Sequence, residues 1–192
     1  MSYHFYAMLS RMKNIYRWGL MRNTKQENLS EHSLEVAFIA HALAVIRNKR
    51  LGGNLDANKI ATAAMFHDTT EIITGDMPTP IKYYNPEIRN VYKQIEELSG
   101  ERLLSMLPKD LRDEFEGFYH LDRDSLKIIK AADKLSALIK CIEEMNMGNR
   151  EFSAAKEATF RAIKEMSLPE ADIFMDEFIE SFSLPLDEQS NK

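Results

Sequence analysis

The chain has 192 residues, of which 44% are apolar, and a formal net charge of −5 at pH 7. This length and composition predict one globular domain with a sizeable core. The negative charge argues against a nucleic-acid polymer as the main partner, because no excess of basic side chains is present to neutralise many phosphates. A single nucleotide remains compatible with this charge, since it needs only one or two local cations.

The cysteine content and the first residues indicate the compartment. Cys141 is the only cysteine, so a disulfide within the chain is impossible and a reducing cytosol fits best. The first residues lack the basic and apolar regions of a signal peptide. No apolar run approaches the 18 residues that a membrane span needs. We therefore expect a cytoplasmic protein that does not enter a membrane.

Apolar residues at helical spacing predict a first helix over residues 3–13, and Gly19 is expected to interrupt the segment that follows. Residues 22–28 are polar and predict a loop. Ser30 is the expected N-cap of a second helix that runs to about residue 48, because its hydroxyl can accept a hydrogen bond from the first turn.

The next segment carries the residues with the most evident chemistry. Asp56 is expected to cap a third helix, which delivers His67 and Asp68 near its C-terminal end. A short helical continuation would hold Glu71. Residues 74–86 contain three prolines within nine positions, which predicts an irregular loop that could form the rim of a pocket.

The rest of the chain also reads as helices, and no strand alternation or internal repeat is evident. The fold class is therefore all-α. We expect a single compact multi-helix domain over residues 1–185 and a polar C-terminal tail over 186–192. The later helices are expected at 87–106, from Pro108 to about 118, at 124–147, at 150–166 and at 169–181.

His67, Asp68 and Glu71 could together bind a divalent metal and handle a water molecule. Neighbouring helical residues point about 100° apart, so His67 and Asp68 can share one ion only at a helix end. Glu71 lies four residues after His67 and returns to the same face of a continuing helix, where it could orient or deprotonate a water. Taken alone, the pair is more simply explained as a solvated helix end.

Asp133 and His32 are the other candidate ligands. Asp133 is flanked by apolar residues, and a buried carboxylate is costly unless a metal or an ion pair, for instance with Lys130 or Lys134, compensates it. His32 lies in the first turn of the second helix, where a surface or capping role is the simpler explanation. His41, nine residues further on, faces the opposite side and cannot share a site with His32. His120 stays unassigned.

The order of these residues resembles a known pattern. His32, His67-Asp68 and Asp133 match the H…HD…D arrangement of the HD-domain metal-dependent phosphohydrolases. Arg17-Trp18, Ser30-Glu-His-Ser33, His67-Asp-Thr-Thr-Glu71 and Thr74-Gly-Asp-Met-Pro-Thr-Pro80 further resemble the bacterial 5′-deoxynucleotidases, over nearly the whole chain.

The resemblance implies an HD-domain fold and a metal centre. One divalent transition metal would be bound by His32, His67, Asp68 and Asp133. In this family the metal is often cobalt. Two imidazoles and two carboxylates suit cobalt, manganese or zinc better than calcium or magnesium. Glu71 would position or activate the attacking water, so that the catalytic residues would be Glu71, Asp68 and Arg17.

The resemblance also implies the substrate and the oligomer. A deoxyribonucleoside 5′-monophosphate would be hydrolysed to a deoxyribonucleoside and phosphate by a homodimer. Arg17 would hold the phosphate, and Trp18 would crowd the 2′ position of the sugar and reject ribonucleotides. Without the resemblance, a lone tryptophan is more simply a core residue. The residues expected to contact the substrate are Arg17, Trp18, His32, Asp68, Asp76, Met77, Pro78, Thr79 and Asp133.

Two rival functions stay open from the sequence. One is another HD-domain nucleotide phosphohydrolase, although enzymes of this class with two metals use further histidines, which are scarce here. The other is a non-catalytic helical dimer in which the metal only braces the core. Glu71 separates this second rival from an enzyme, because a structural metal site is closed to water and needs no base beside it.

Overall fold

The computed structural model describes residues 2–82 and 84–190, with the backbone alone for Thr79. These residues are mainly helical, as the all-α prediction requires, and an isolated antiparallel bridge joins Tyr16 to Asn28. The elements in chain order are α1 (Phe5–Leu9), η1 (Ser10–Asn14), α2 (Leu29–Arg50), α3 (Ala57–Phe66), α4 (Glu71–Thr74), α5 (Thr79–Lys82), α6 (Pro86–Leu104), α7 (Lys109–Tyr119), α8 (Arg123–Asn146), η2 (Arg150–Phe152), α9 (Ser153–Glu165), α10 (Pro169–Phe178), η3 (Ile179–Ser183) and α11 (Leu186–Gln189).

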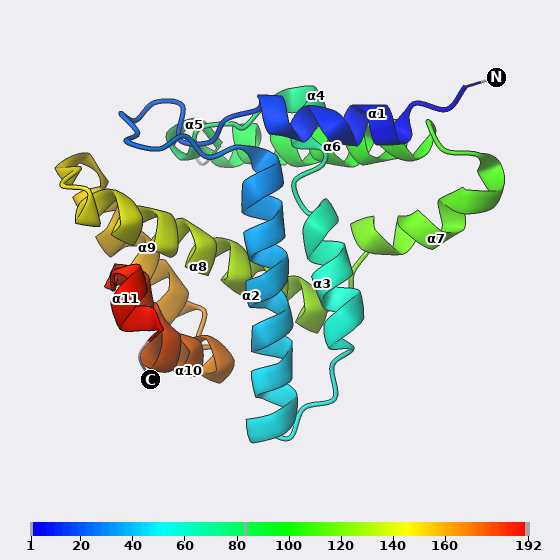
Figure 1. Ribbon diagram of the computed structural model, residues 1–192. Helices are drawn as coiled ribbons and strands as arrows, with labels where there is room; N and C mark the ends of the chain where they lie inside the picture. Colours follow the sequence, from blue (N-terminus) through cyan, green and yellow to red (C-terminus); the bar gives the residue numbers. More distant parts are fainter. Residues whose placement is uncertain (1, 83, 191–192) are drawn as a thin grey trace.

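Helix α2 stands in the middle of the molecule, with α3 beside it and α8 crossing it, while α1 and α6 run across its N-terminal end (Figure 1). The main core lies where α2, α3, α8 and α10 meet. Its fully buried side chains include Val36, Leu43, Ile60, Ile128 and Leu135. A smaller core of Phe5, Leu103 and Leu107 packs α1 against α6 and the residues that follow it.

The N-cap of α2 corrects the sequence prediction. Asn28, not Ser30, caps the helix, and its side chain accepts hydrogen bonds from the backbone N–H groups of Ser30 and Glu31. Glu31 in turn accepts from the N–H of Asn28, which completes a capping box. The helix therefore starts earlier than predicted, and this reciprocal pair fixes the first turn, in which His32 lies.

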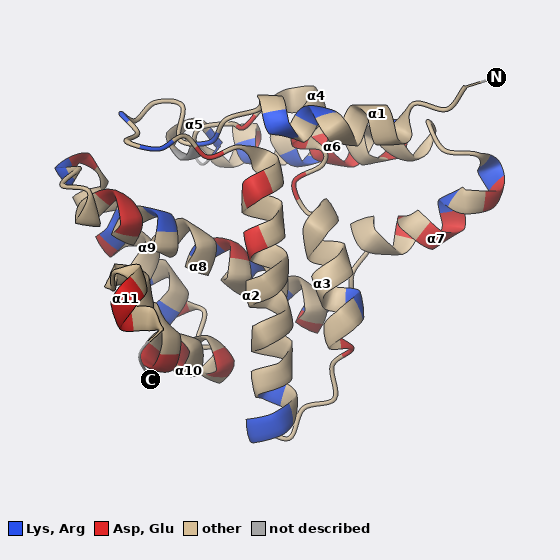
Figure 2. Cartoon of the chain, in the orientation of Figure 1, with Lys and Arg blue, Asp and Glu red and all other residues tan. Residues whose placement is uncertain are grey.

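Helix α2 is long and apolar enough to span a membrane by length and composition alone, but more than half of its most apolar window is buried inside the protein. That burial is typical of the central helix of a globular core. Figure 2 shows basic residues at its C-terminal end, where Arg47, Lys49 and Arg50 form the last turn. Cations there complement the helix dipole.

The segment after α3 has the expected break. Asp56 caps α3, as predicted, by accepting from the N–H of Lys59, and the helix ends at Phe66 with His67 as its C-cap. A turn then leads into α4, whose first residue is Glu71. The proline-rich segment differs from the prediction in one respect. Residues Thr79–Lys82 form the single helical turn α5, which is compatible with proline because Pro80 lies within its first turn.

Candidate metal centre

His32 is held on both sides of its ring. The side chain is fully buried, and its Nδ1 lies 2.7 Å from Arg17 Nη1 and 3.0 Å from Ser136 Oγ. Ser136 Oγ donates in turn to Glu35 Oε2, 2.5 Å away. The opposite ring nitrogen, Nε2, lies 3.1 Å from Asp133 Oδ1 and 3.5 Å from Asp68 Oδ2. The ring therefore presents Nε2 to two carboxylates.

His67 presents the same nitrogen to the same place. Its Nδ1 lies 2.7 Å from the carbonyl oxygen of Ala64, one turn back in α3. A proton on Nδ1 would be donated to that carbonyl, which leaves the lone pair on Nε2. Nε2 lies 3.2 Å from Asp68 Oδ2, and the rings of His32 and His67 have their centroids 5.3 Å apart. The end of α3 thus allows both neighbours, His67 and Asp68, to point at one position.

The carboxylates make this position favourable for positive charge. Burial alone would lower the pKa of His67, but the adjacent charge of Asp68 raises that pKa to about 9. Burial would likewise raise the pKa of Asp68, but His67 and then His32 hold it well below its usual range. A divalent cation between these groups would satisfy the same electrostatic demand.

Asp133 comes from α8 and contacts this group through His32, although the ligand atoms that lie within 4.8 Å of one another are those of His32, His67 and Asp68. Its side chain is 39% exposed, so this carboxylate is only partly buried despite its apolar flanking residues. Within the described residues it pairs with His32 and, at 3.7 Å, with Arg17 Nη2 rather than with Lys130 or Lys134. Desolvation opposes ionisation, but the adjacent His32 lowers the pKa of Asp133 to about 2.

These residues fit a transition metal. Nδ1 or Nε2 atoms of His32 and His67 and a carboxylate oxygen of Asp68 all lie within 4.8 Å of one another. The Nε2 atoms of both histidines are buried and have no hydrogen-bond partner among the described residues. Unpaired imidazole nitrogens beside two carboxylates form the mixed nitrogen and oxygen set that cobalt, manganese and zinc accept.

Glu71 is the first residue of α4 and lies next to the histidine-aspartate group. Its side chain is buried, and its Oε2 has no hydrogen-bond partner within the described part of the chain. Burial, and then the charges of Asp68 and Asp76, raise the pKa of Glu71 to about 9. Such a carboxyl is costly to bury without a function, and it is suited to take up a proton beside a cation that would favour its ionised form.

Arg17 and Trp18 lie on the other side of His32, in the segment that joins η1 to α2. Arg17 is mostly buried and contacts His32, Asp133 and Glu27. Trp18 is half-buried, packs at 5.3 Å between ring centroids against the fully buried Phe152, and has a positive φ of 62°. Bulky residues seldom adopt this left-handed conformation. The indole therefore lies at the edge of the core beside Arg17.

The proline-containing loop approaches from a third side. Burial raises the pKa of Asp76, whereas the nearby charge of Arg17 opposes this shift. Met77 and Pro78 follow in the same loop and are half-buried. The side chain of Thr79 lies outside the described part of the structure. Arg17 and Asp76, which are far apart in sequence, therefore come within electrostatic reach of each other and of the histidine-aspartate group.

The other histidines lie elsewhere. His4, His41 and His120 are all exposed, and His41 does not share the site of His32, as predicted. Three residues that contact the centre were missed from the sequence, namely Glu27, Glu35 and Ser136. Glu27 precedes the N-cap of α2, and the other two are one helical turn from His32 and Asp133. Their position three residues after His32 and Asp133 on the predicted helices could have indicated Glu35 and Ser136. Nothing in the sequence indicated that Glu27 contacts Arg17 and Trp18.

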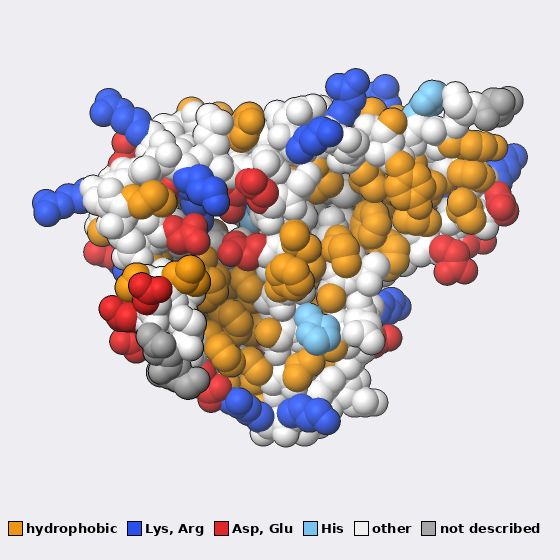
Figure 3. Space-filling model, viewed as in Figure 1, with side chains coloured by type: hydrophobic (Ala, Val, Ile, Leu, Met, Phe, Trp, Pro, Cys, Tyr) orange, Lys and Arg blue, Asp and Glu red, His pale blue; other side chains and the backbone are white. Residues whose placement is uncertain are grey.

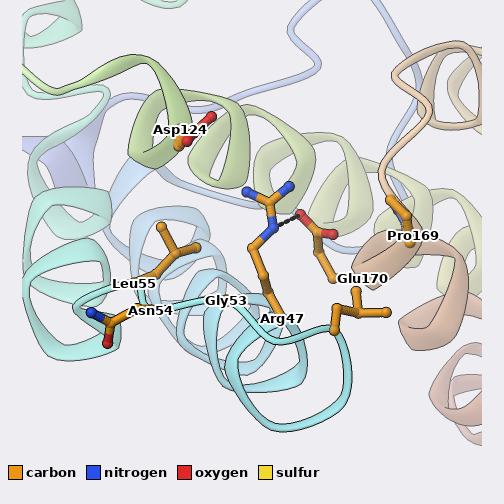
Figure 4. Close-up of a pocket in the computed structure, with 8 residues that line it drawn as sticks. Arg47, Gly53, Asn54, Leu55, Asp124, Pro169 and Glu170 are labelled. Atoms are coloured by element: carbon orange, nitrogen blue, oxygen red, sulfur yellow. Dashed lines mark ion pairs between the residues drawn. The ribbon is translucent and has the colours of Figure 1, made fainter.

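A separate cavity of about 570 Å³ lies at the far end of α2, lined by residues that include Arg47, Asp124 and Glu170 (Figure 4). Arg47 Nε pairs there with Oε1 of the fully buried Glu170 at 3.2 Å. This ion pair links the C-terminal part of α2 to α10, while neither carboxylate oxygen of Glu170 has a hydrogen-bond partner among the described residues. The cavity contains none of the residues around His32.

Comparison with known sequences supports one family. The model of the YfbR-like 5′-deoxynucleotidase family matches residues 4–182. A 5′-deoxynucleotidase of Photobacterium profundum is 50% identical over 190 residues, which cover 97% of this chain and 98% of the relative. A 5′-deoxynucleotidase of Yersinia pestis strain Pestoides F is also 50% identical over 190 residues, with 97% and 96% of the two chains covered.

Solved structures with little sequence identity have the same fold. An HD-domain phosphohydrolase from Listeria innocua superposes with a TM-score of 0.80 at 22% identity, covering 93% of this chain and 88% of that one. The HD phosphohydrolase of cyanophage S-2L, bound to dA and one catalytic Zn²⁺ ion, superposes with a TM-score of 0.66 at 18% identity, covering 91% and 96%. The all-α architecture is therefore the HD-domain fold.

Proposed function

The chain belongs to the YfbR-like 5′-deoxynucleotidase family, and from this premise we propose that it hydrolyses deoxyribonucleoside 5′-monophosphates with selection against ribonucleotides. It is a phosphomonoester hydrolase, as its curated relatives are named. The observation that carries the proposal is the grouping of His32, His67 and Asp68, whose ligand atoms lie within 4.8 Å of one another. Asp133 contacts His32, and Glu71 and Arg17 lie beside these residues.

His32, His67, Asp68 and Asp133 would hold one divalent transition metal, which is cobalt, manganese or zinc. When bound, such a metal polarises a phosphoryl oxygen and makes a water more acidic. The unpaired Nε2 atoms of the two histidines support this assignment. The relation of His67 to the carbonyl of Ala64 supports it as well, because a metal-ligating histidine commonly donates its other ring proton to such a group.

The reaction exchanges one P–O bond for another. The oxygen of a water attacks phosphorus, the bond to the 5′ oxygen breaks, and the departing oxygen takes up a proton. Glu71 would hold this water and accept its proton, with Asp68 as its neighbour in the ligand group. Arg17 would bind the phosphate oxygens, since a planar guanidinium donates two parallel hydrogen bonds to such an anion.

The sugar and the base would contact the residues around Arg17. Trp18 would fill the space beside the 2′ carbon, where a hydroxyl needs both room and a polar partner. Asp76, Met77, Pro78 and Thr79 would line the sugar and base side of the site. The loop that carries them lies within electrostatic reach of Arg17, which supports this placement.

The enzyme would act in the cytoplasm as a homodimer, with no nucleic-acid polymer and no membrane as a partner. The lone Cys141 is free and buried, as suits a reducing compartment. Three large apolar side chains on α2 and α3, those of Leu34, Phe38 and Met65, are 51%, 68% and 45% exposed. Figure 3 shows hydrophobic side chains gathered on this face, and a second copy would cover them.

A phosphate-release panel tests the proposed function. Deoxyribo- and ribonucleoside 5′-monophosphates are compared after chelation and after addition of cobalt, manganese, zinc or magnesium. We expect release from the deoxy series, loss with chelator, recovery with a transition metal, and little release from the ribo series. A Trp18→Ala variant should lose much of this preference. Equal wild-type rates on both series would exclude the role of Trp18, and no release from any nucleotide would exclude the activity.

A further inference from the structure

One carboxylate oxygen contacts both Arg17, which is assigned to the phosphate, and Trp18, which is assigned to the sugar. Glu27 Oε2 accepts a hydrogen bond from Arg17 Nη1 at 2.9 Å and another from Trp18 Nε1 at 2.9 Å. We propose that Glu27 is a positioning residue that sets the guanidinium and the indole in their binding geometry and thereby determines selection between deoxyribose and ribose. This inference rests on the proposed function, which assigns the phosphate to Arg17 and the sugar to Trp18.

The position of Glu27 is fixed independently of the two side chains that it contacts. The backbone N–H of Thr24 donates to Glu144 Oε2 at 2.8 Å, and that of Lys25 donates to Glu144 Oε1 at 3.1 Å. Glu144 is fully buried on α8 and also pairs with Lys140, which donates to the carbonyl of Lys25. The loop before α2 is therefore anchored to α8 two residues before Glu27. This anchor fixes the backbone position of Glu27 relative to Arg17 and Trp18.

The backbone brings the two segments together but does not set the side chains. The N–H of Arg17 donates to the carbonyl of Glu27 at 3.0 Å, and the N–H of Leu29 donates to that of Ile15 at 3.0 Å. These bonds place Trp18 beside the loop in its left-handed conformation. An indole on such a backbone can still rotate about its side-chain bonds, and the hydrogen bond to Glu27 selects one orientation.

The same carboxylate engages the guanidinium at one corner only. Glu27 accepts a hydrogen bond from Nη1 of Arg17, and the same nitrogen contacts His32. The N–H groups on Nη2 and Nε of Arg17 donate no hydrogen bond to Glu27. Glu27 is 12% exposed, and a charge-assisted bond in such a poorly hydrated place holds its partner firmly. The guanidinium is thus oriented before an anion arrives, and the ordering cost of binding is reduced.

The experiment compares Glu27→Ala with Glu27→Gln. The amide oxygen of glutamine can still accept both hydrogen bonds, whereas alanine accepts neither. For Glu27→Ala we expect KM for a deoxyribonucleoside 5′-monophosphate to rise about tenfold, and the ratio of kcat/KM between deoxy and ribo substrates to fall about tenfold, as the loss of a hydrogen bond to a charged group predicts. Glu27→Gln should keep most of the wild-type ratio.

A second readout does not depend on activity. Trp18 is the only tryptophan, so intrinsic fluorescence reports on its indole alone. In Glu27→Ala we expect emission at longer wavelength and lower anisotropy, with the bound metal unchanged. Glu31→Ala is the matched control, because Glu31 lies four residues further on, in the first turn of α2, and accepts from the N–H of Asn28 rather than from Arg17 or Trp18. It should lower the melting temperature without changing the ratio or the emission.

The outcomes separate the two proposals. A wild-type ratio and wild-type emission in Glu27→Ala would overturn the role of Glu27, as would an equal loss on both substrate series with unchanged emission. A wild-type enzyme without activity on deoxynucleotides would overturn the proposed function instead. In that case the emission of Glu27→Ala would still decide whether Glu27 orients the indole.

Discussion

His32 Nε2 lies 3.1 Å from Asp133 Oδ1, although the two residues belong to different helices. Helix α2 delivers the imidazole from its first turn, and α8 delivers the carboxylate from its middle. The crossing of these two helices therefore determines the geometry of the proposed metal centre. The first predictions concern this centre and the carboxyl group beside it.

Removal of one ligand should remove the metal. In His67→Ala we expect the metal bound per chain to fall to a small fraction of the wild-type value, because one of the two imidazoles is lost. Phosphate release should fall with it, and added metal should restore little of it. Elemental analysis of the purified protein measures the metal. His41→Ala, in which an exposed histidine on the same helix as His32 is changed, is the control. Full metal content in His67→Ala would contradict the assignment.

Glu71→Gln should separate catalysis from binding. The amide resembles the neutral carboxyl in size, so the fold and the bound metal should persist, while kcat should fall about a hundredfold or more because no base remains to take a proton from water. KM should change little. Steady-state kinetics at saturating metal measures both constants, with Glu97→Gln on the exposed face of α6 as control. An unchanged kcat would show that Glu71 handles no proton.

The buried carboxylate of Glu144 should make stability depend on pH. Burial alone would raise its pKa, but hydrogen bonds from Lys140 and the Thr24 N–H hold it well below the usual range. A depressed pKa contributes stability above the unfolded value of about 4.3, and that contribution is lost as pH falls further.

Denaturant unfolding at several pH values measures this contribution. At pH 7, Glu144→Gln should lower the free energy of unfolding by about 3 kcal/mol, because it leaves Lys140 buried without its anion. The deficit should shrink as pH falls below about 4, because the carboxyl of Glu144 then binds a proton in the unfolded wild type while the folded state still resists it. A deficit independent of pH would mean that packing rather than ionisation of Glu144 stabilises the loop.

A charge on the exposed apolar face should break the proposed dimer. Phe38 is 68% exposed on α2, and a stable interface of standard size buries about 800 Å² on each partner. Phe38→Glu would place a carboxylate in that interface without a partner, so the mass in solution should change from dimer to monomer. Light scattering measures this mass. Leu186→Glu, a similar change at a 77% exposed residue of α11, is the control. A wild type that is already monomeric would contradict the proposal.

The proposed metal ligands could be predicted from the sequence for a physical reason. A histidine and an aspartate can share an ion only where a helix ends, and the end of α3 at Phe66 provides that place. The capped start of α2 likewise indicated a stiff position for His32, although Asn28 rather than Ser30 is the cap. Both residues can cap, and the reciprocal bond with Glu31 favours the earlier one.

Other features depend on contacts that no local pattern contains. The side chain of Asp133 is partly exposed because it lies at the rim between α8 and Arg17, which apolar flanking residues cannot indicate. The exposure of Phe38 depends on which neighbour covers α2, not on its spacing. Glu27 reaches Arg17 and Trp18 only because a loop is folded back on itself and tied to another helix.

That tie has a consequence for anyone who wishes to move this site into another scaffold. Lys140 and Glu144 lie on the same helix as Asp133 and hold the loop that leads to Glu27. The loop that leads to Glu27 and helix α8, which carries Asp133, would therefore have to be moved together. On the proposed function, a graft of the four proposed ligands alone would bind the metal but would lack the segment that we propose to distinguish deoxyribose from ribose.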